Sequence, residues 1–313
     1  MIGCDGLMKA PYLLVTSCLV FYLASCDLGV EPDPVEEEEV VQRELTPEQR
    51  RKKEGANLFA PELALPSGTK LTQSRSVTME HLGVNISQGG KTVATGAADI
   101  AYEEARETVM VSKSIAKFIM GDAGMKMKLT LRDQPPNETV EPYPLEGQTI
   151  VKDGDQVSME DVPNDDQKEA MNSFRAAWFG GNALFVDAMI KRRGSWDVAP
   201  ETVLEAIFSE TFTSGSGDVK LSVQKFFSFE GVESAEVTVS LNRCRATMVD
   251  SKGQEVEVEL QAYGTLYRSL DPPHTTRVDI DGKVQMKMVQ GDSELQFNGP
   301  FECQAKSDVV LPK

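Results

Sequence analysis

Alternation of apolar and polar residues is the feature that most constrains how this chain can fold. It recurs in residues 125–133, 255–262 and 282–290, where apolar side chains occupy every second position and mostly polar or charged residues stand between them. A period of two is typical of antiparallel strands that place one face on a core and the other in water. We therefore expect an α+β, mainly β fold: a large curled antiparallel sheet, or open half barrel, with a few short helices packed on it.

The predicted strands are long, about ten to fourteen residues against the usual five or six, which implies strong twist and curling. Turn residues stand between them at 250–253, 281–282 and 291–293. One strand changes phase, because its apolar residues occupy odd positions up to Leu241 and even positions from Cys244. A β-bulge near Asn242–Arg243 would join the two halves.

A helical insertion at about 165–210 separates two β-rich parts. Its first helical stripe is followed by Gly180-Gly181, and Pro200 opens a further short helix. The apolar positions expected on three helix faces are Met171, Phe174 and Trp178; then Leu184, Phe185, Ala188 and Met189; then Val203, Leu204, Ile207 and Phe208.

The N-terminus carries an apolar run, PYLLVTSCLVFYLAS at 11–25, without any charge. Fifteen helical residues are too short to cross the roughly 30 Å hydrocarbon core, so the run is typical of a secretory signal peptide at 1–25. It ends in Leu23-Ala24-Ser25-Cys26, which resembles the lipobox of bacterial lipoproteins. The resemblance implies cleavage before Cys26, acylation of Cys26, and a lipid-anchored protein of the bacterial cell envelope that faces the periplasm or the exterior.

The expected domain organisation follows from this start. Residues 26–66 are expected to be the lipidated Cys and a disordered acidic tether, because they hold Pro32, Pro34 and the run Glu36–Glu39 without a sustained apolar face. A short helix at 46–54 is predicted inside the tether, with Thr46 and Gln49 as a capping box. Residues 67–313 are expected to form a single β-rich domain.

The net charge of −17 argues against nucleic acid as a partner, since binding it needs clustered Lys and Arg. Contact with the membrane is therefore expected through the N-terminal lipid alone.

Two cysteines remain in the β-rich part, Cys244 and Cys303, and both stand in the apolar phase of their strands. In an oxidising compartment this pattern favours a disulfide between them, although buried free thiols would give the same pattern.

Motifs of catalysis and metal binding are absent from the sequence. The two histidines, His81 and His274, stand far apart, and HExxH, CxxC, GxSxG and P-loop patterns are missing. The aspartate pairs in VKDGDQV and VDIDGK are more typical of hairpin turns than of calcium sites. We expect a protein that is not an enzyme and that needs neither metal nor cofactor.

The lipobox, the acidic tether and the curled sheet together resemble envelope lipoproteins of the lipoprotein-carrier type, whose open half barrel holds acyl chains. The order YPLEGQTI (143–150), then helices, then RRGSW (192–196), also resembles uncharacterised lipoproteins of large-genome, envelope-rich bacteria. The resemblances imply a fold and a location but assign no ligand residues.

Two functions are consistent with these features. The first is a binding protein for a lipid or another apolar ligand, because methionine adapts to irregular apolar surfaces. Its candidate ligand-binding residues are Met125, Met127, Trp178, Phe185, Met286 and Met288. The alternative is a structural or assembly lipoprotein that contacts other envelope proteins. An apolar cavity would favour the first, and a filled core with an exposed apolar patch would favour the second.

Overall fold

The computed structural model describes residues 46–59, 65–172, 174, 179, 183–249 and 254–312. These residues fall in one compact unit, Leu45–Lys313. The predicted signal peptide, Cys26 and the acidic run at 36–39 lie outside the described residues.

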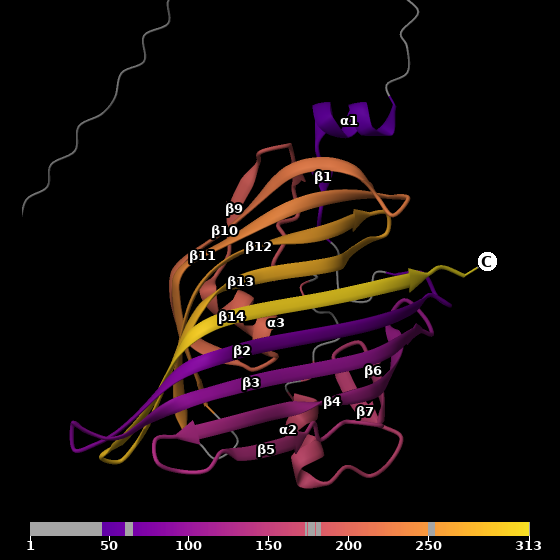
Figure 1. Cartoon of the computed structure of the whole chain (residues 1–313). Helices are drawn as coiled ribbons and strands as arrows, with labels where there is room; N and C mark the ends of the chain where they lie inside the picture. Colours follow the sequence, from indigo (N-terminus) through magenta and orange to yellow (C-terminus); the bar gives the residue numbers. More distant parts are fainter. Residues whose placement is uncertain are drawn as a thin grey trace, which may run out of the picture. The chain divides into compact units, whose positions relative to one another are not determined.

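Eight long antiparallel strands build the large sheet (Figure 1). They are 16 to 20 residues long, longer than expected from the sequence: β2 (Lys70–Gln88), β3 (Lys91–Met110), β4 (Ile115–Leu131), β10 (Phe212–Phe229), β11 (Val232–Val249), β12 (Glu255–Leu270), β13 (Pro273–Gln290) and β14 (Ser293–Val310). The short strands are β1 (Ala56–Asn57), β5 (Asn137–Pro142), β6 (Thr149–Asp153), β7 (Gln156–Met159), β8 (Met189–Ile190) and β9 (Ser195–Asp197).

The topology joins two meanders. Strands β2 to β4 form one and β10 to β14 form the other, and β14 pairs with β2 to give a 12-stranded sheet ordered β7-β6-β4-β3-β2-β14-β13-β12-β11-β10-β9, with β5 on β4. The sheet is not closed, since β7 and β9 are its ends. The prediction of a mainly β, open antiparallel sheet with a few short helices is confirmed.

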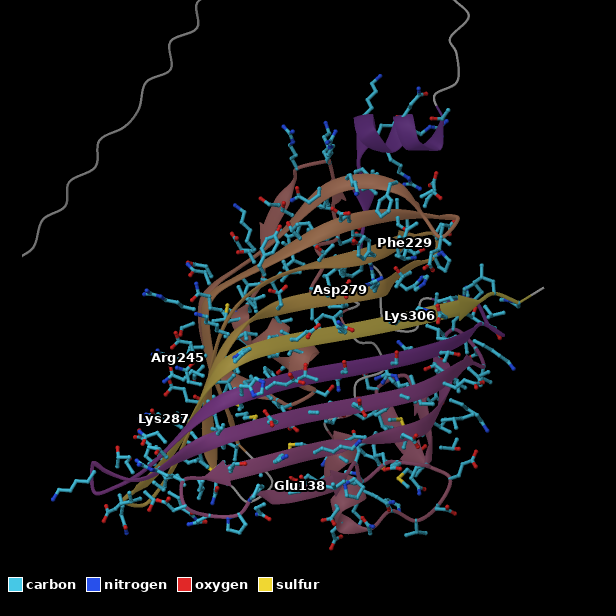
Figure 2. All side chains as sticks on the ribbon, viewed as in Figure 1. Glu138, Phe229, Arg245, Asp279, Lys287 and Lys306 are labelled. Carbon is cyan, nitrogen blue, oxygen red and sulfur yellow. The ribbon has the colours of Figure 1, made fainter. Side chains whose placement is uncertain are left out.

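The face of the sheet that carries the core is called the inner face, and the opposite face the outer face. The main core lies where α3 (Pro200–Phe208) and the segment that contains Phe185 and Trp196 pack on β10 to β14. A second core around Phe118 and Ile150 lies beside α2 (Asp165–Asn172). Charged side chains such as Lys287 and Glu138 line the strands where they face solvent (Figure 2).

Two of the predicted helices are confirmed, and the first helix of the insertion is confirmed in part, as α2, which ends at Asn172. Helix α1 (Pro47–Glu54) begins after Thr46, whose hydroxyl accepts from the Gln49 N–H in a capping box. Helix α3 begins at Pro200 and buries Val203, Leu204 and Ile207. The helix expected from Leu184 onward is wrong, because this segment forms turns and then strand β8.

The predicted bulge is confirmed on β11. Leu241 pairs with Ala262 and Cys244 pairs with Leu260, so Asn242 and Arg243 stand opposite a single residue. Arg243 has a φ of 51°, in the left-handed region. The phase change in the sequence therefore marked a real irregularity.

The turn expected at Asp281–Gly282 is wrong, because both residues lie in the middle of β13. Gly282 pairs with Ala262, and a Cβ added to it would lie 2.2 Å from the Gln261 carbonyl oxygen. Glycine here permits a close approach between long strands rather than a reversal of the chain.

The folded part begins earlier than the expected residue 67. Ala56 and Leu58 are buried in the main core, and the Arg268 Nε donates to the Leu58 carbonyl at 3.0 Å. The tether prediction missed these residues because two short apolar side chains give no periodic signal.

The predicted disulfide between Cys244 and Cys303 is wrong, because both are buried free thiols. Cys244 lies on β11 and Cys303 on β14, with β12 and β13 between them. Three strand spacings amount to about 14 Å, well beyond the roughly 7 Å limit for bridged Cα atoms. Both thiols lie on the inner face of the sheet, but on strands that do not pair with each other.

Candidate functional site

An apolar strip continues the inner face toward the hairpins that join β2 to β3 and β13 to β14. Cross-strand pairing aligns Met248, Val256, Met288, Leu295 and Ile86 in one row. A second row holds Met286 and Leu131 at its two sides, with Phe297 and Val84 between them. We call the half-buried members the hairpin-end strip: Ile86, Leu131, Met248, Met286, Met288 and Leu295.

The strip differs from the main core in burial. Leu204 and Ile207 of α3 are fully buried, whereas the side chains of the strip pack against the main core and keep part of their surface in solvent. An apolar surface that the chain itself covers incompletely can take further apolar surface from a ligand.

The candidate ligand-binding residues separate into two groups. Met125 and Met127 are half-buried on the inner face of β4, and Met286 and Met288 are half-buried on β13. Strands β3, β2 and β14 stand between the two pairs, so the sheet places them on one face without direct pairing.

Phe185 belongs to the core rather than to an open surface. It is 2 % exposed, its ring centroid lies 6.0 Å from that of Trp196, and the Arg268 guanidinium lies 4.4 Å above its ring. Trp178 lies outside the described residues, and its role stays a prediction.

A belt of buried polar residues divides the two cores on the inner face of β2 and β3. Arg75 Nη2 and Glu104 Oε2 are 2.7 Å apart, and the Tyr102 hydroxyl donates to the same oxygen at 2.9 Å. Arg75 Nη1 also donates to the Ala206 and Ile207 carbonyls at the end of α3. The belt thereby fixes the end of this helix on the sheet.

The belt continues along β3 to the second core. Arg106 Nε donates to the Gln73 side chain at 3.0 Å, and its guanidinium lies over the rings of Phe118 and Phe174. Burial lowers the pKa of Arg106 to about 10, partly offset by Glu104, and burial also raises the pKa of Tyr102. Arg75, Glu104 and Arg106 hold charge inside the protein through their partners.

The sequence analysis missed this belt, although the signal was present. Arg75 stands in the inward phase of Leu71 and Val77, and Glu104 and Arg106 share a phase with Ile100. Charged residues at inward positions of an alternating strand indicate a buried polar network.

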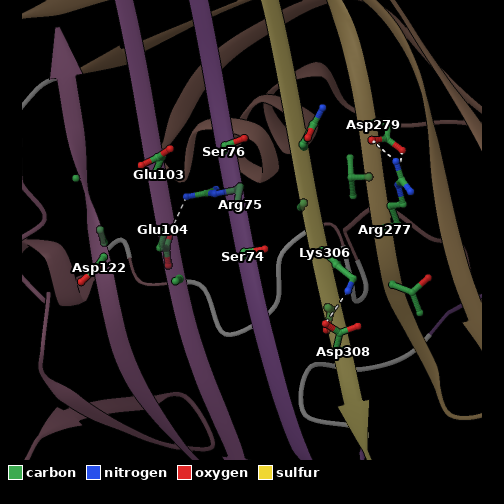
Figure 3. A pocket seen from close by; sticks show the side chains of 18 of the residues that line it. Ser74, Arg75, Ser76, Glu103, Glu104, Asp122, Arg277, Asp279, Lys306 and Asp308 are labelled. Carbon is green, nitrogen blue, oxygen red and sulfur yellow. Dashed lines mark hydrogen bonds and ion pairs between the residues drawn. The ribbon is translucent and has the colours of Figure 1, made fainter.

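A groove of about 1000 Å³ lies on the outer face, across β13, β14, β2, β3 and β4 (Figure 3). Side chains that point into it include Ser74, Ser76, Glu103, Asp279 and Lys306. Its lining combines charged and hydroxyl side chains with apolar residues such as Val140, Phe229 and Val309.

Within the described ranges, no group of three or more His, Cys, Asp or Glu side chains is arranged to hold a metal ion. The described helices also include none that is long and apolar enough to span a membrane. His274, whose Nδ1 lies 2.8 Å from the Pro272 carbonyl oxygen, has a pKa lowered by burial.

Comparison with known proteins gives distant structural likenesses alone. No family model and no curated protein matches the sequence. A solved structure titled "Lipid-protein interactions in lipovitellin" matches with a TM-score of 0.41 and 10 % identity, over 80 % of this chain and 26 % of that one. The chain thus spans about a quarter of the length of the matching protein.

Proposed function

We propose that this chain is a non-enzymatic envelope lipoprotein that binds a lipid or another apolar ligand at the hairpin-end strip. The observation that carries the proposal is the incomplete burial of six apolar side chains that continue the inner face beyond α3. Three of the six are Met248, Met286 and Met288. Methionine has a flexible, polarisable side chain, which suits a ligand surface of irregular shape.

The ligand would add to the core rather than fill an enclosed cavity. Each methylene group that moves from water onto the strip contributes about 0.8 kcal/mol, so an acyl chain has enough apolar surface to bind with useful affinity. Met125 and Met127 on β4 extend the same half-buried surface and would contact a longer ligand.

The experiment is native mass spectrometry of the full chain purified from membranes. We expect an additional mass of a lipid that is not covalently attached, reduced in the double variant Met286→Gln, Met288→Gln and retained in the matched control Met286→Leu, Met288→Leu. An unliganded wild-type protein, or equal lipid retention by the Gln and Leu variants, would contradict the proposal.

Membrane attachment is a separate part of the proposal and rests on Leu23-Ala24-Ser25-Cys26. Cys26→Ser should move the protein from the membrane fraction to the soluble fraction, because the acyl chains supply the anchoring free energy. If the Cys26→Ser protein still partitions into detergent, the lipobox interpretation is wrong.

The second candidate function is that of a structural or assembly lipoprotein. Val93, Val249 and Val289 are 59 %, 58 % and 51 % exposed, and they stand close to the hairpins next to the strip. An apolar rim of this kind also suits a protein partner. Loss of a cross-linked envelope protein in a Val93→Asp, Val289→Asp variant, with lipid retention unchanged, would favour this function.

A further inference from the structure

The outer-face groove owes its depth to small residues in its floor. Pairing places Ser74 opposite Ala105 and Ser76 opposite Glu103, while Glu103 pairs in turn with Gly124. Serine, alanine and glycine leave the centre of the face low, and longer side chains rise on both sides. The groove as a whole crosses five strands, which at about 4.8 Å spacing is about 19 Å from β13 to β4.

Charged pairs form the two walls. On the β13–β14 side, Arg277 Nε lies 2.7 Å from Asp279 Oδ2, and Lys306 Nζ lies 2.9 Å from Asp308 Oδ2. On the other side, Lys126 Nζ lies 3.9 Å from Glu103 Oε2. All these side chains are more than one third exposed, and in Figure 3 the two pairs on β13 and β14 stand beside the serines of β2.

An aromatic cluster flanks the groove at the end of β10. The Phe229 ring lines the groove and stacks on Tyr267, with centroids 4.8 Å apart and planes at 13°. Phe227 contacts both rings edge-on at 6.0 Å. The cluster stands on the polar face of the sheet, and through Phe229, which Tyr267 and Phe227 support, it gives one side of the groove an aromatic surface.

The charges of the lining residues limit the class of ligand that the groove can bind. Eight acidic residues and four Lys or Arg line it, so a polyanion would be repelled. Arg75 pairs with Glu104 on the inner face, and Lys126, Arg277 and Lys306 pair with carboxylates on the outer face. A polar ligand would therefore exchange hydrogen bonds with these outer carboxylates and with the serine hydroxyls.

We propose that the outer-face groove binds an uncharged glycan strand. Vicinal hydroxyl groups match paired carboxylate, amide and guanidinium groups, and the apolar face of a sugar ring matches an aromatic wall. This site lies on the opposite face from the hairpin-end strip and does not depend on the ligand proposed there.

The experiment is isothermal titration of the full chain in detergent with four probes. Two are neutral, the β-1,4-linked hexamers of glucose and of N-acetylglucosamine. One is anionic, a hyaluronan oligosaccharide, and one is cationic, hexalysine. We expect binding of at least one neutral hexamer and none of hyaluronan. Failure of both neutral hexamers to bind, or tighter binding of hexalysine, would overturn the proposal.

Variants locate the binding. Ser76→Trp fills the floor and should weaken binding of the neutral hexamer at least about tenfold. Ser240→Trp, which places the same ring at an exposed position of β11 outside the groove, should leave it unchanged. Gln304→Ala, a milder change in the row of Ser76, should weaken binding severalfold and serves if Ser76→Trp fails to fold. Undiminished binding in folded Ser76→Trp, or in Gln304→Ala if that variant alone folds, would overturn the proposal.

Discussion

The two faces of the sheet carry the same kind of ion pair in opposite surroundings. Arg75 and Glu104 on the inner face are 2.7 Å apart with side chains at most 5 % exposed, whereas Lys306 and Asp308 on the outer face are 2.9 Å apart and more than half exposed. From the distances alone, the two ion pairs would be expected to contribute equally to stability. Burial makes their contributions differ, because a buried charge that has lost its water is stabilised only by its partner, whereas an exposed charge is also stabilised by solvent.

The sharpest test of this comparison removes one partner on each face. Glu104→Ala should lower the free energy of unfolding by about 3–5 kcal/mol, since it leaves the buried Arg75 without its carboxylate. Urea denaturation of the full chain measures the change. Asp308→Ala is the matched variant and should cost about 1 kcal/mol or less. Equal losses on the two faces would break the comparison.

The inner face itself contains a covered region and an open one. Leu204→Ala in α3 should cost about 2–5 kcal/mol, because it leaves a cavity in a fully buried site. Met288→Ala in the hairpin-end strip should cost about half as much or less, since its side chain is already partly in solvent. The same denaturation measurement applies. A Met288→Ala loss as large as that of Leu204→Ala would mean that the strip is ordinary core.

Cys303 gives a smaller effect that depends on pH. Burial raises its thiol pKa from 9.0 to about 12, so the unfolded chain releases this proton at a lower pH than the native protein. The contribution to stability is complete below pH 9 and is lost as the pH rises toward 12. Between pH 8 and pH 10.5 we expect the wild type to lose about 1–2 kcal/mol more than Cys303→Ala does.

Equal pH slopes for the wild type and Cys303→Ala would contradict a buried free thiol. Maleimide labelling provides the control. Both thiols should be protected in the native protein and should react after unfolding without reductant, which a disulfide would prevent.

The alternation of the sequence was enough to predict an open antiparallel sheet, and the phase change at Asn242–Arg243 was enough to predict its bulge. It could not predict which strands pair. Asp281–Gly282 resembles a turn in sequence, yet it lies inside β13 because closely spaced long strands also need glycine. The pairing of β14 with β2 joins the two ends of the domain and leaves no local signal.

The two candidate sites also differ in how far the sequence could predict them. The half-buried methionines stood out because period two assigns each side chain to a face. The outer-face groove did not, since its floor combines Ser74 and Ser76 with Gly124 on another strand, and only the register brings them together. Single serines on the solvent face of a strand are too common to indicate a site.

Photo-crosslinking with a diazirine-bearing fatty acid tests the central claim, which is that the inner face takes an apolar ligand at its hairpin end. The full chain is irradiated with the probe, digested and mapped by mass spectrometry. We predict saturable labelling of peptides that contain Met286, Met288 and Leu295, competed by unlabelled fatty acid. Labelling confined to the outer-face groove around Ser74 and Ser76, or labelling that does not saturate, would contradict the account.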